Sequence, residues 1–171
     1  MKTVIVGAGF IGRVLADHLL ECNHSVTICD IVNPQIRGTK FLYNDIAKDP
    51  FTLPDSVDAV FYLAQSPFYR DFPQKSVHLF SINTLGPIKV AEESLNRGAK
   101  FLFYASTGNV YSLTFESSSE TAPVNRNNPY AVSKLAAEEM LALFRPFMTI
   151  SIGRIFGAYG RGQTTMLPSV L

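Results

Sequence analysis

The sequence predicts an α/β domain built around a doubly wound parallel sheet with helices on both faces. Short apolar runs rich in β-branched residues alternate with longer segments of helical period, which is the pattern of successive βαβ units. The predicted strands are apolar along their whole length rather than at alternate positions, as expected where helices cover both faces of a sheet. The length of 171 residues suits one domain, over residues 1–171, with its own core.

The predicted elements follow one another in this alternating order. An apolar run at 2–7 leads through a glycine turn into a segment of helical period at 10–23. The remaining strands are expected in the apolar runs at 25–30, 39–45, 58–64, 99–106 and 148–156. The remaining helices are expected at 74–97 and 129–144. A loop at 113–128, rich in Ser, Asn and Pro, is expected to lie over the sheet edge as a flap.

Composition and charge argue against several classes of partner. The net charge is +1 and no segment carries a basic stripe, which disfavours nucleic acid as the main partner. No apolar run reaches about 18 residues, so no membrane span is predicted. The apolar start of the chain runs straight into the glycine turn, so we interpret it as a first strand rather than a signal peptide and expect a cytoplasmic protein.

Metal binding is not expected from the sequence. Cys22 and Cys29 have no cluster of His or Cys near them, so buried reduced thiols are favoured over a metal site or a disulfide. The three His residues are scattered without the spacing of metal ligands.

The stretch "VGAGFIG" places Gly7, Gly9 and Gly12 between the first strand and the first helix. The first glycine allows the tight turn, the second lets a pyrophosphate approach the backbone, and the third lets the helix sit close to the strand. The free N–H groups of the helix N-terminus attract the anion. This pattern predicts a dinucleotide-binding loop, and the alternative is a simple tight turn.

Asp30 ends the second predicted strand, where a carboxylate can accept hydrogen bonds from the hydroxyls of an adenosine ribose. It would also repel a 2′-phosphate, so NAD is favoured over NADP. Arg37 would instead favour NADP if its guanidinium reached the 2′-phosphate of this ribose. A plain capping role for Asp30 is the other alternative.

The chemistry is predicted around Tyr130 and Lys134. Positions i and i+4 of a helix share a face, so these two side chains are expected to project together. A nearby ammonium favours the phenolate, so we expect Lys134 to lower the pKa of Tyr130 and make it a usable base. Ser106 and Thr107 follow the fifth strand, where a hydroxyl can orient the reacting oxygen. The alternative is a solvated lysine beside a packed tyrosine.

Several motifs in the same order resemble the extended short-chain dehydrogenase/reductase family, and within it the NAD-dependent epimerase/dehydratase group. The segments that carry the resemblance along essentially the whole chain are "VGAGFIG", "CD", "NDI", "FYLAQ", "INTLGP", "STGNVY", "PYAVSK" and "GRIFGAYGRGQ". The resemblance implies a Rossmann-type fold that binds NAD through Gly7, Gly9, Phe10, Ile11, Gly12, Asp30, Asp45, Ile46, Leu63, Ala64, Gln65, Tyr130 and Lys134.

The resemblance also implies a catalytic group of Thr107, Tyr130, Lys134 and Asn83. Position 87 is proline, which has no N–H, so the Asn83 carbonyl is expected to lose its i+4 donor. In the family the carbonyl of this asparagine serves a water relay to the lysine, and we expect the same here. The alternative is a simple proline kink.

The expected activity is that of an NAD-dependent sugar epimerase, with a nucleotide sugar as the small-molecule substrate. A dehydratase is disfavoured because Gly108 and Asn109 stand where the family's dehydratases carry an Asp-Glu pair. Gly157 stands where the family often has an asparagine that contacts substrate, which weakens the transfer of substrate specificity. The alternatives are a carbonyl reductase or dehydrogenase of another small molecule, and a non-catalytic dinucleotide-binding sensor or scaffold.

Two further expectations concern the whole molecule. The family's C-terminal substrate lobe lies mostly beyond the sixth strand, so residues 1–171 are expected to be an NAD(P)-binding domain from a longer chain. Family members often form a homodimer in which two long helices of each subunit build a four-helix contact. By analogy we expect this contact from residues near 76–97 and 130–144.

Overall fold

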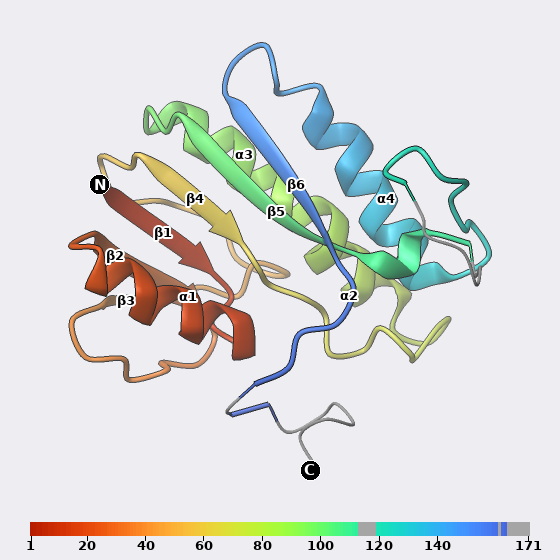
Figure 1. Ribbon diagram of the computed structural model, residues 1–171, viewed down its shortest axis with the longest axis horizontal. Coiled ribbons are helices and arrows are strands. Elements are labelled where there is room, and N and C mark those ends of the chain that lie inside the picture. The colour runs from red at the N-terminus through yellow and green to blue at the C-terminus, as the bar shows by residue number, and fades with distance from the viewer. Residues whose placement is uncertain (113–118, 161, 164–171) are drawn as a thin grey trace.

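The computed structural model describes residues 1–112, 119–160 and 162–163 of the chain. In this part, six strands form one sheet in the order β3-β2-β1-β4-β5-β6, and every pairing is parallel. The strands are β1 (Lys2–Val6), β2 (Ser25–Asp30), β3 (Lys40–Tyr43), β4 (Ala59–Tyr62), β5 (Phe101–Thr107) and β6 (Thr149–Ile155). This is the predicted doubly wound parallel sheet of Rossmann type (Figure 1).

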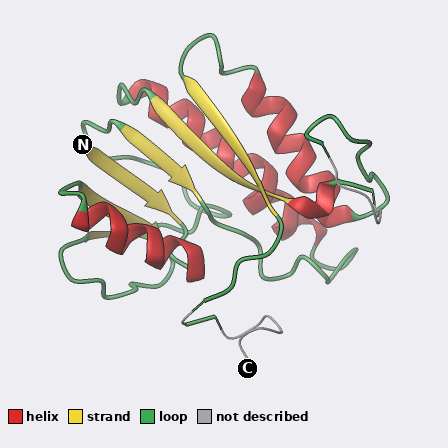
Figure 2. Cartoon of the chain, viewed as in Figure 1, coloured by secondary structure: helices red, strands yellow, loops and turns green. Residues whose placement is uncertain are grey.

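The order of the strands reverses between β1 and β4, because the chain builds outward to β3 and then returns to the other side of β1. Strands of a parallel sheet all end at the same edge, as the arrowheads show in Figure 2. The crevice beyond the carboxyl ends at such a reversal is the usual ligand site of this architecture. The fold therefore places a site beyond the ends of β1, β4 and β5.

The helices differ from the prediction at one point. They are α1 (Phe10–Glu21), α2 (Ser76–Phe80), α3 (Gly86–Asn96) and α4 (Pro129–Ala142). The helix predicted over 74–97 is interrupted by a π-helical turn at Ser81–Leu85, just before Pro87. The other predicted strands and helices end within about two residues of the observed ones, which is the usual uncertainty of element boundaries.

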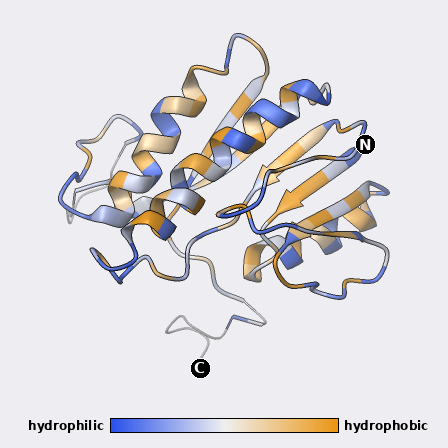
Figure 3. Ribbon diagram, turned by 180° about the vertical axis from the view of Figure 1, so that it is seen from behind, coloured by the Kyte–Doolittle hydropathy of each residue, from blue (hydrophilic) through white to orange (hydrophobic). Residues whose placement is uncertain are grey.

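The helices cover both faces of the sheet, as predicted. Helix α1 lies on one face, and α3 and α4 lie side by side on the other, as Figures 1 and 3 show from opposite sides. Neighbouring strand residues point to opposite faces, so the core divides in two. On the α1 side, Ile5 and Ile28 pack with Ala16. On the other side, Val60 and Leu102 belong to the cluster that contains residues of α3 and α4.

The start of α4 is fixed by local signals. The Asn128 side chain accepts a hydrogen bond from the backbone N–H of Tyr130 at 2.9 Å, which is the standard N-terminal cap. Pro129 occupies the first helical position, where its missing N–H has no consequence. These two residues hold Tyr130 in the first turn of the helix.

Two smaller expectations can be compared with the structure. Cys22 and Cys29 are both free thiols, but only Cys29 is buried, so the prediction of a buried thiol is wrong for Cys22. The predicted flap includes residues 113–118, which lie outside the described residues. In its described part, the Glu120 carbonyl accepts a hydrogen bond from Arg154 of the edge strand β6, which agrees with a position at the sheet edge. No helix in the described ranges is long and apolar enough to cross a membrane.

Candidate active site

The crevice at the strand ends consists of two adjoining hollows that share Gly9, Leu63 and Gln65. The first, of about 530 Å³, is lined by the predicted cofactor residues Gly7, Gly9, Asp30, Asp45, Ile46, Leu63, Ala64 and Gln65. The second, of about 340 Å³, is lined by the predicted residues Gly9, Phe10, Ile11, Gly12, Leu63, Gln65, Thr107, Tyr130 and Lys134. The structure thus brings together all the predicted site residues except Asn83, which lines neither hollow.

The glycines of the first loop are required for different reasons. Gly7 has a φ of +94°, and a side chain there would lie 2.5 Å from the Ala64 backbone nitrogen. A side chain at Gly12 would lie 2.3 Å from the Gly7 carbonyl oxygen, so this glycine allows α1 to sit against the strand turn. A methyl group at Gly9 would have no atom of the described residues within 4 Å, so the space there is open toward the crevice.

This contrast predicts different results for two alanine variants. Gly12→Ala must shift the loop, so we expect it to lower both the free energy of unfolding and the affinity for a dinucleotide. Gly9→Ala meets no atom of the described residues, so its unfolding free energy should change by less than about 0.5 kcal/mol. Its methyl group would still occupy the path of a pyrophosphate, and dinucleotide affinity should fall about tenfold or more. Chemical denaturation and calorimetric titration measure both quantities, and an unchanged affinity in Gly9→Ala would contradict this role of the loop.

Asp30 has the capping role considered for it, and its contact with a ribose stays a prediction. One carboxylate oxygen accepts a hydrogen bond from the Ala8 N–H at 2.6 Å, and the other accepts from the Val32 N–H at 3.1 Å. The carboxylate therefore ties the glycine loop to the end of β2. Each oxygen retains further acceptor capacity and Asp30 lines the first hollow, so an acceptor remains for a ribose hydroxyl. Arg37 is exposed and does not line this hollow.

Tyr130 is buried and donates a hydrogen bond from its hydroxyl to Oε1 of Gln65 at 2.9 Å. Burial raises the pKa of Tyr130 above its ordinary value, and a hydrogen bond with Thr107 opposes this change in part. The expectation that Lys134 lowers this pKa is therefore not met in this structure. The reason lies in the environment of the lysine itself.

Lys134 is almost completely buried, and its Nζ donates a hydrogen bond to the Ala105 carbonyl at 2.9 Å. The same nitrogen lies 5.0 Å from the centre of the Tyr104 ring. Burial lowers the pKa of Lys134 to about 7, although the negative charge of Glu138 acts in the opposite direction. A lysine with this pKa is only partly charged near neutral pH, so it is a weaker source of positive charge for the tyrosine than the sequence suggested.

The structure distinguishes the two hydroxyl residues that follow β5. Ser106 donates a hydrogen bond to Oε1 of Glu138 and is engaged by that carboxylate. Thr107 is the partner whose hydrogen bond affects the Tyr130 pKa, and its Oγ1 also accepts from the Asn109 N–H at 3.2 Å. The assignment of the orienting role to Thr107 rather than Ser106 is consistent with this arrangement.

Asn83 lies in the π-helical turn and is fully buried. Its Oδ1 accepts from the Ser66 N–H and its Nδ2 donates to Ser133 Oγ, both at 3.0 Å. Its carbonyl, which was expected to be free for a water, accepts a hydrogen bond from the Tyr104 hydroxyl at 2.8 Å. A carbonyl oxygen has a second lone pair, so the water relay stays a prediction. The observed contacts make Asn83 a connection between the loop after β4, strand β5 and helix α4.

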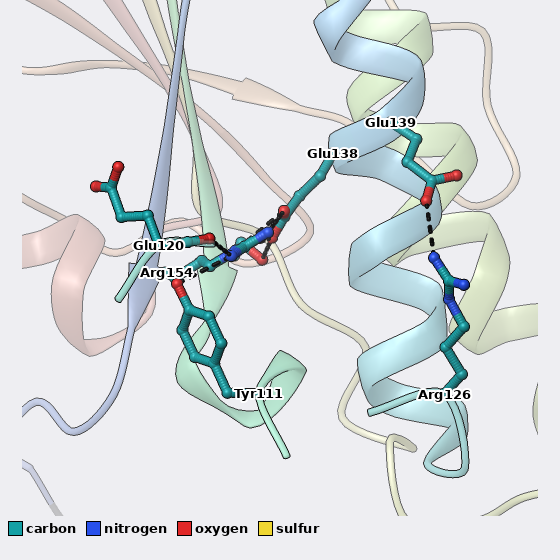
Figure 4. Close-up of polar contacts among 7 residues, drawn as sticks. Tyr111, Glu120, Arg126, Glu138, Glu139 and Arg154 are labelled. Carbon is teal, nitrogen blue, oxygen red and sulfur yellow. Dashed lines mark hydrogen bonds and ion pairs between the residues drawn. The ribbon is translucent and has the colours of Figure 1, made fainter. Parts of the chain in front are cut away.

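Arg154 and Glu138 form a partly buried ion pair that was missed in the sequence, one turn further along the helix face that carries Lys134. The Arg154 guanidinium donates to both carboxylate oxygens of Glu138, at 2.6 Å for the shortest contact, and to the Tyr111 hydroxyl at 2.9 Å. Figure 4 shows Arg154 of β6 between Glu138 and Tyr111. The spacing of residues could have indicated the role of Glu138, because it follows Lys134 by one helical turn and so lies on the same helix face. The pair fixes α4 to β6 and holds Ser106, the neighbour of Thr107.

Comparisons with known proteins agree with this geometry. The model of the NAD dependent epimerase/dehydratase family matches residues 3–171. The UDP-glucose 4-epimerase of Streptococcus mutans is 31% identical over 153 residues, which are 81% of this chain and 45% of that protein. A putative UDP-glucose 4-epimerase of Methanocaldococcus jannaschii is 30% identical over 175 residues, covering 95% of this chain and 57% of that protein. The chain thus spans about half the length of these relatives.

Solved structures show the same relationship. The structure of MoeE5 in complex with UDP-glucuronic acid and NAD aligns with a TM-score of 0.84 and 27% identity, covering 100% of this chain and 60% of that one. Pal from Bacillus thuringiensis aligns with a TM-score of 0.82 and 28% identity, covering 98% of this chain and 59% of that one.

Proposed function

The chain belongs to the NAD-dependent epimerase/dehydratase family of extended short-chain dehydrogenases/reductases, and we propose that it serves the NAD-dependent epimerisation of a nucleotide sugar. The observation that carries this proposal is the convergence of Tyr130, Lys134 and Thr107 on one hollow beside the glycine loop. The names of the relatives support the substrate class, because the two similar proteins from S. mutans and M. jannaschii are a UDP-glucose 4-epimerase and a putative one.

The residues that line the crevice fit NAD as the cofactor. The N-terminus of α1 at Gly9 offers N–H groups to the pyrophosphate, and Asp30 offers a carboxylate to the adenosine ribose. Asp45 and Ile46 line the same hollow and would flank the adenine. A second phosphate on the ribose would meet the charge of Asp30, which favours NAD over NADP. The structure of the similar MoeE5 contains NAD.

In the proposed mechanism Thr107 orients the hydroxyl of the substrate and Tyr130 accepts its proton as the carbinol is oxidised. NAD, when bound, supplies the hydride acceptor. Lys134 would hold the nicotinamide ribose, and its partly charged ammonium would give the phenolate of Tyr130 limited support. Tyr130 would return the proton after the keto sugar has turned its other face to the cofactor, which would give the same hydride back, so that no NAD would be consumed.

A water-eliminating reaction is less well supported by the site. The family's dehydratases use an adjacent carboxylate pair as acid and base, and the residues after Thr107 are Gly108 and Asn109. Among the described residues that line the reaction hollow there is no Asp or Glu. General acid–base elimination would therefore lack its carboxyl groups.

A turnover assay of the full-length protein tests the proposed function. We expect UDP-glucose or UDP-glucuronic acid to be converted to an epimer in the presence of catalytic NAD, without accumulation of NADH. Stoichiometric NADH would instead identify a dehydrogenase. Tight NAD binding without turnover on any carbinol or carbonyl substrate would contradict an enzyme and favour a sensor or scaffold.

We also propose that the protein forms a homodimer through α3 and α4. These helices lie side by side on the face shown in Figure 3. Exposed apolar side chains on α2, on α4 and on the turns next to α3 and α4 include Val77, Leu85, Met140 and Leu143, and a four-helix contact would cover them. Analytical ultracentrifugation of the full-length protein tests this proposal, and a monomer at micromolar concentration would contradict it.

A further inference from the structure

The loop after β4 carries an arginine that no step of the proposed mechanism uses. The Arg70 guanidinium lies over the ring of Tyr69, with its carbon 5.1 Å from the ring centre. The Tyr69 ring in turn packs against the Tyr130 ring, with the ring centres 5.2 Å apart. Arg70 is therefore connected to the proposed catalytic tyrosine through a single intervening aromatic ring.

Arg70 lines a hollow of about 470 Å³ that adjoins the reaction hollow. Its lining residues are Tyr69, Arg70, Phe72, Asn109, Asn128, Pro129 and Tyr130. Tyr69, Asn109 and Tyr130 line both hollows, so the two form neighbouring parts of one surface. A substrate whose reacting carbon lies at Tyr130 would have Arg70 in the adjoining hollow.

The guanidinium of Arg70 has unused hydrogen-bonding capacity. Within the described residues it makes no hydrogen bond and no ion pair, and its only specific contact is with the Tyr69 ring. By contrast, Arg97 and Arg154 each bind a carboxylate. Stacking on an aromatic ring restricts the guanidinium while its N–H donors stay available for a planar anion.

The charges of the residues that line these two hollows also favour an anionic ligand. The described residues that line the reaction hollow and the Arg70 hollow include Lys134 and Arg70 but no Asp or Glu. The carboxylates of the crevice, Asp30 and Asp45, line only the hollow at the adenosine end. An anionic group is therefore favoured beside Tyr130.

We propose that Arg70 binds an oxyanion of the substrate, either a carboxylate on the sugar or a phosphate of the nucleotide, in a subsite next to Tyr130. This inference rests on the proposed function. Arginine suits both groups, because its planar fork can donate two parallel hydrogen bonds to a carboxylate or a phosphate. The two sources differ in one respect: every nucleotide sugar carries the phosphates, and only a uronic acid also carries the carboxylate.

The test compares UDP-glucose and UDP-glucuronic acid as substrates of the full-length wild type and of Arg70→Gln and Arg70→Lys. We expect Arg70→Gln to raise KM about 10- to 100-fold, the usual effect of losing a charged hydrogen bond, with kcat and NAD affinity nearly unchanged. Arg70→Lys should recover part of the loss, because it keeps the charge without the fork. Lys75→Gln removes a charge from the same loop outside the hollow and should leave KM unchanged.

The pattern across substrates identifies the oxyanion. An increase in KM confined to UDP-glucuronic acid identifies a sugar carboxylate, and equal increases for both substrates identify a phosphate. Unchanged KM for both substrates in Arg70→Gln overturns the proposal. If the wild type turns over neither compound, the proposed function fails, and calorimetric titration of both compounds into wild type and Arg70→Gln still decides whether Arg70 binds them.

Discussion

A Tyr130→Phe variant of the full-length protein is expected to turn over its substrate about a thousandfold more slowly than the wild type, within the usual range for removal of a general acid–base group. The phenol is the group that takes the proton from the substrate hydroxyl, and phenylalanine cannot replace it. Binding of NAD should change by no more than about threefold, because the ring and its packing against Tyr69 are retained. Single-turnover reduction of bound NAD separates the chemical step from binding.

The same variant makes a prediction about pH. Burial raises the pKa of Tyr130, so the phenolate fraction grows with pH throughout the neutral and mildly alkaline range. The rate of NAD reduction by the wild type should therefore rise with pH, and the residual rate of Tyr130→Phe should lose this dependence. Tyr43→Phe, which removes an exposed hydroxyl outside the crevice, is the matched control and should behave as the wild type. If Tyr130→Phe keeps the full rate, another group is the base.

The features that could be predicted from the sequence are those set by residues close together in the chain. The glycine loop is one case, because the close approaches at Gly7 and Gly12 arise within one strand–turn–helix unit. The topology is another, because continuous apolar strands separated by helical segments permit few arrangements. The pairing of Tyr130 with Lys134 on one face follows from helical geometry alone.

The parts that could not be predicted depend on partners distant in sequence. The low pKa of Lys134 requires its burial against β5, which no local pattern encodes. The contacts of Asn83 join segments that the fold brings together: Ser66 after β4, Tyr104 on β5 and Ser133 on α4. Pro87 correctly indicated a disturbed helical turn, since the π-helical turn lies just before it. No local pattern shows that a tyrosine hydroxyl binds the Asn83 carbonyl.

These contacts suggest why the helix is interrupted where it is. In the π-helical turn the Asn83 side chain reaches Ser133, whose hydroxyl in turn donates to the Tyr130 carbonyl at 2.7 Å. A chain of buried hydrogen bonds thus runs from the loop after β4 to the first turn of α4. Satisfied buried networks of this kind hold their members in one arrangement. The network therefore supports the position of the tyrosine without contacting the crevice.

Replacement of Lys134 by methionine is expected to have the second large effect. It should change both the rate of turnover and the free energy of unfolding. Turnover should fall about a hundredfold or more, because the proposed support for the phenolate and the ribose is lost. Stability should change in a pH-dependent way. The pKa of Lys134 is about 7 in the folded protein and close to the ordinary value of about 10.4 in the unfolded chain. Between these values the unfolded chain binds a proton that the folded protein does not.

The sign of the stability effect follows from this difference. Below pH 7 lysine is charged in both states, so the folded protein bears the full unfavourable effect of a buried ammonium. As pH rises from 7 toward 10, this lysine contributes an increase in the unfolding free energy of up to about 1.4 kcal/mol per pH unit. Methionine does not titrate, so the wild type should gain stability relative to Lys134→Met across this range. The two proteins share all other titrating groups, whose effects largely cancel in the difference.

Denaturant titrations of both proteins, freed of bound nucleotide, at pH 6, 7, 8 and 9 measure this difference. Lys100→Met serves as the control, because Lys100 is exposed and its replacement should give a difference independent of pH. A flat difference for Lys134→Met as well would mean that the ammonium remains charged in the folded protein at neutral pH. In that case the lysine would be able to lower the pKa of Tyr130 as the sequence first indicated, and the catalytic base would be active at lower pH. The slope of this one curve therefore decides which of the two descriptions of the tyrosine–lysine pair is correct.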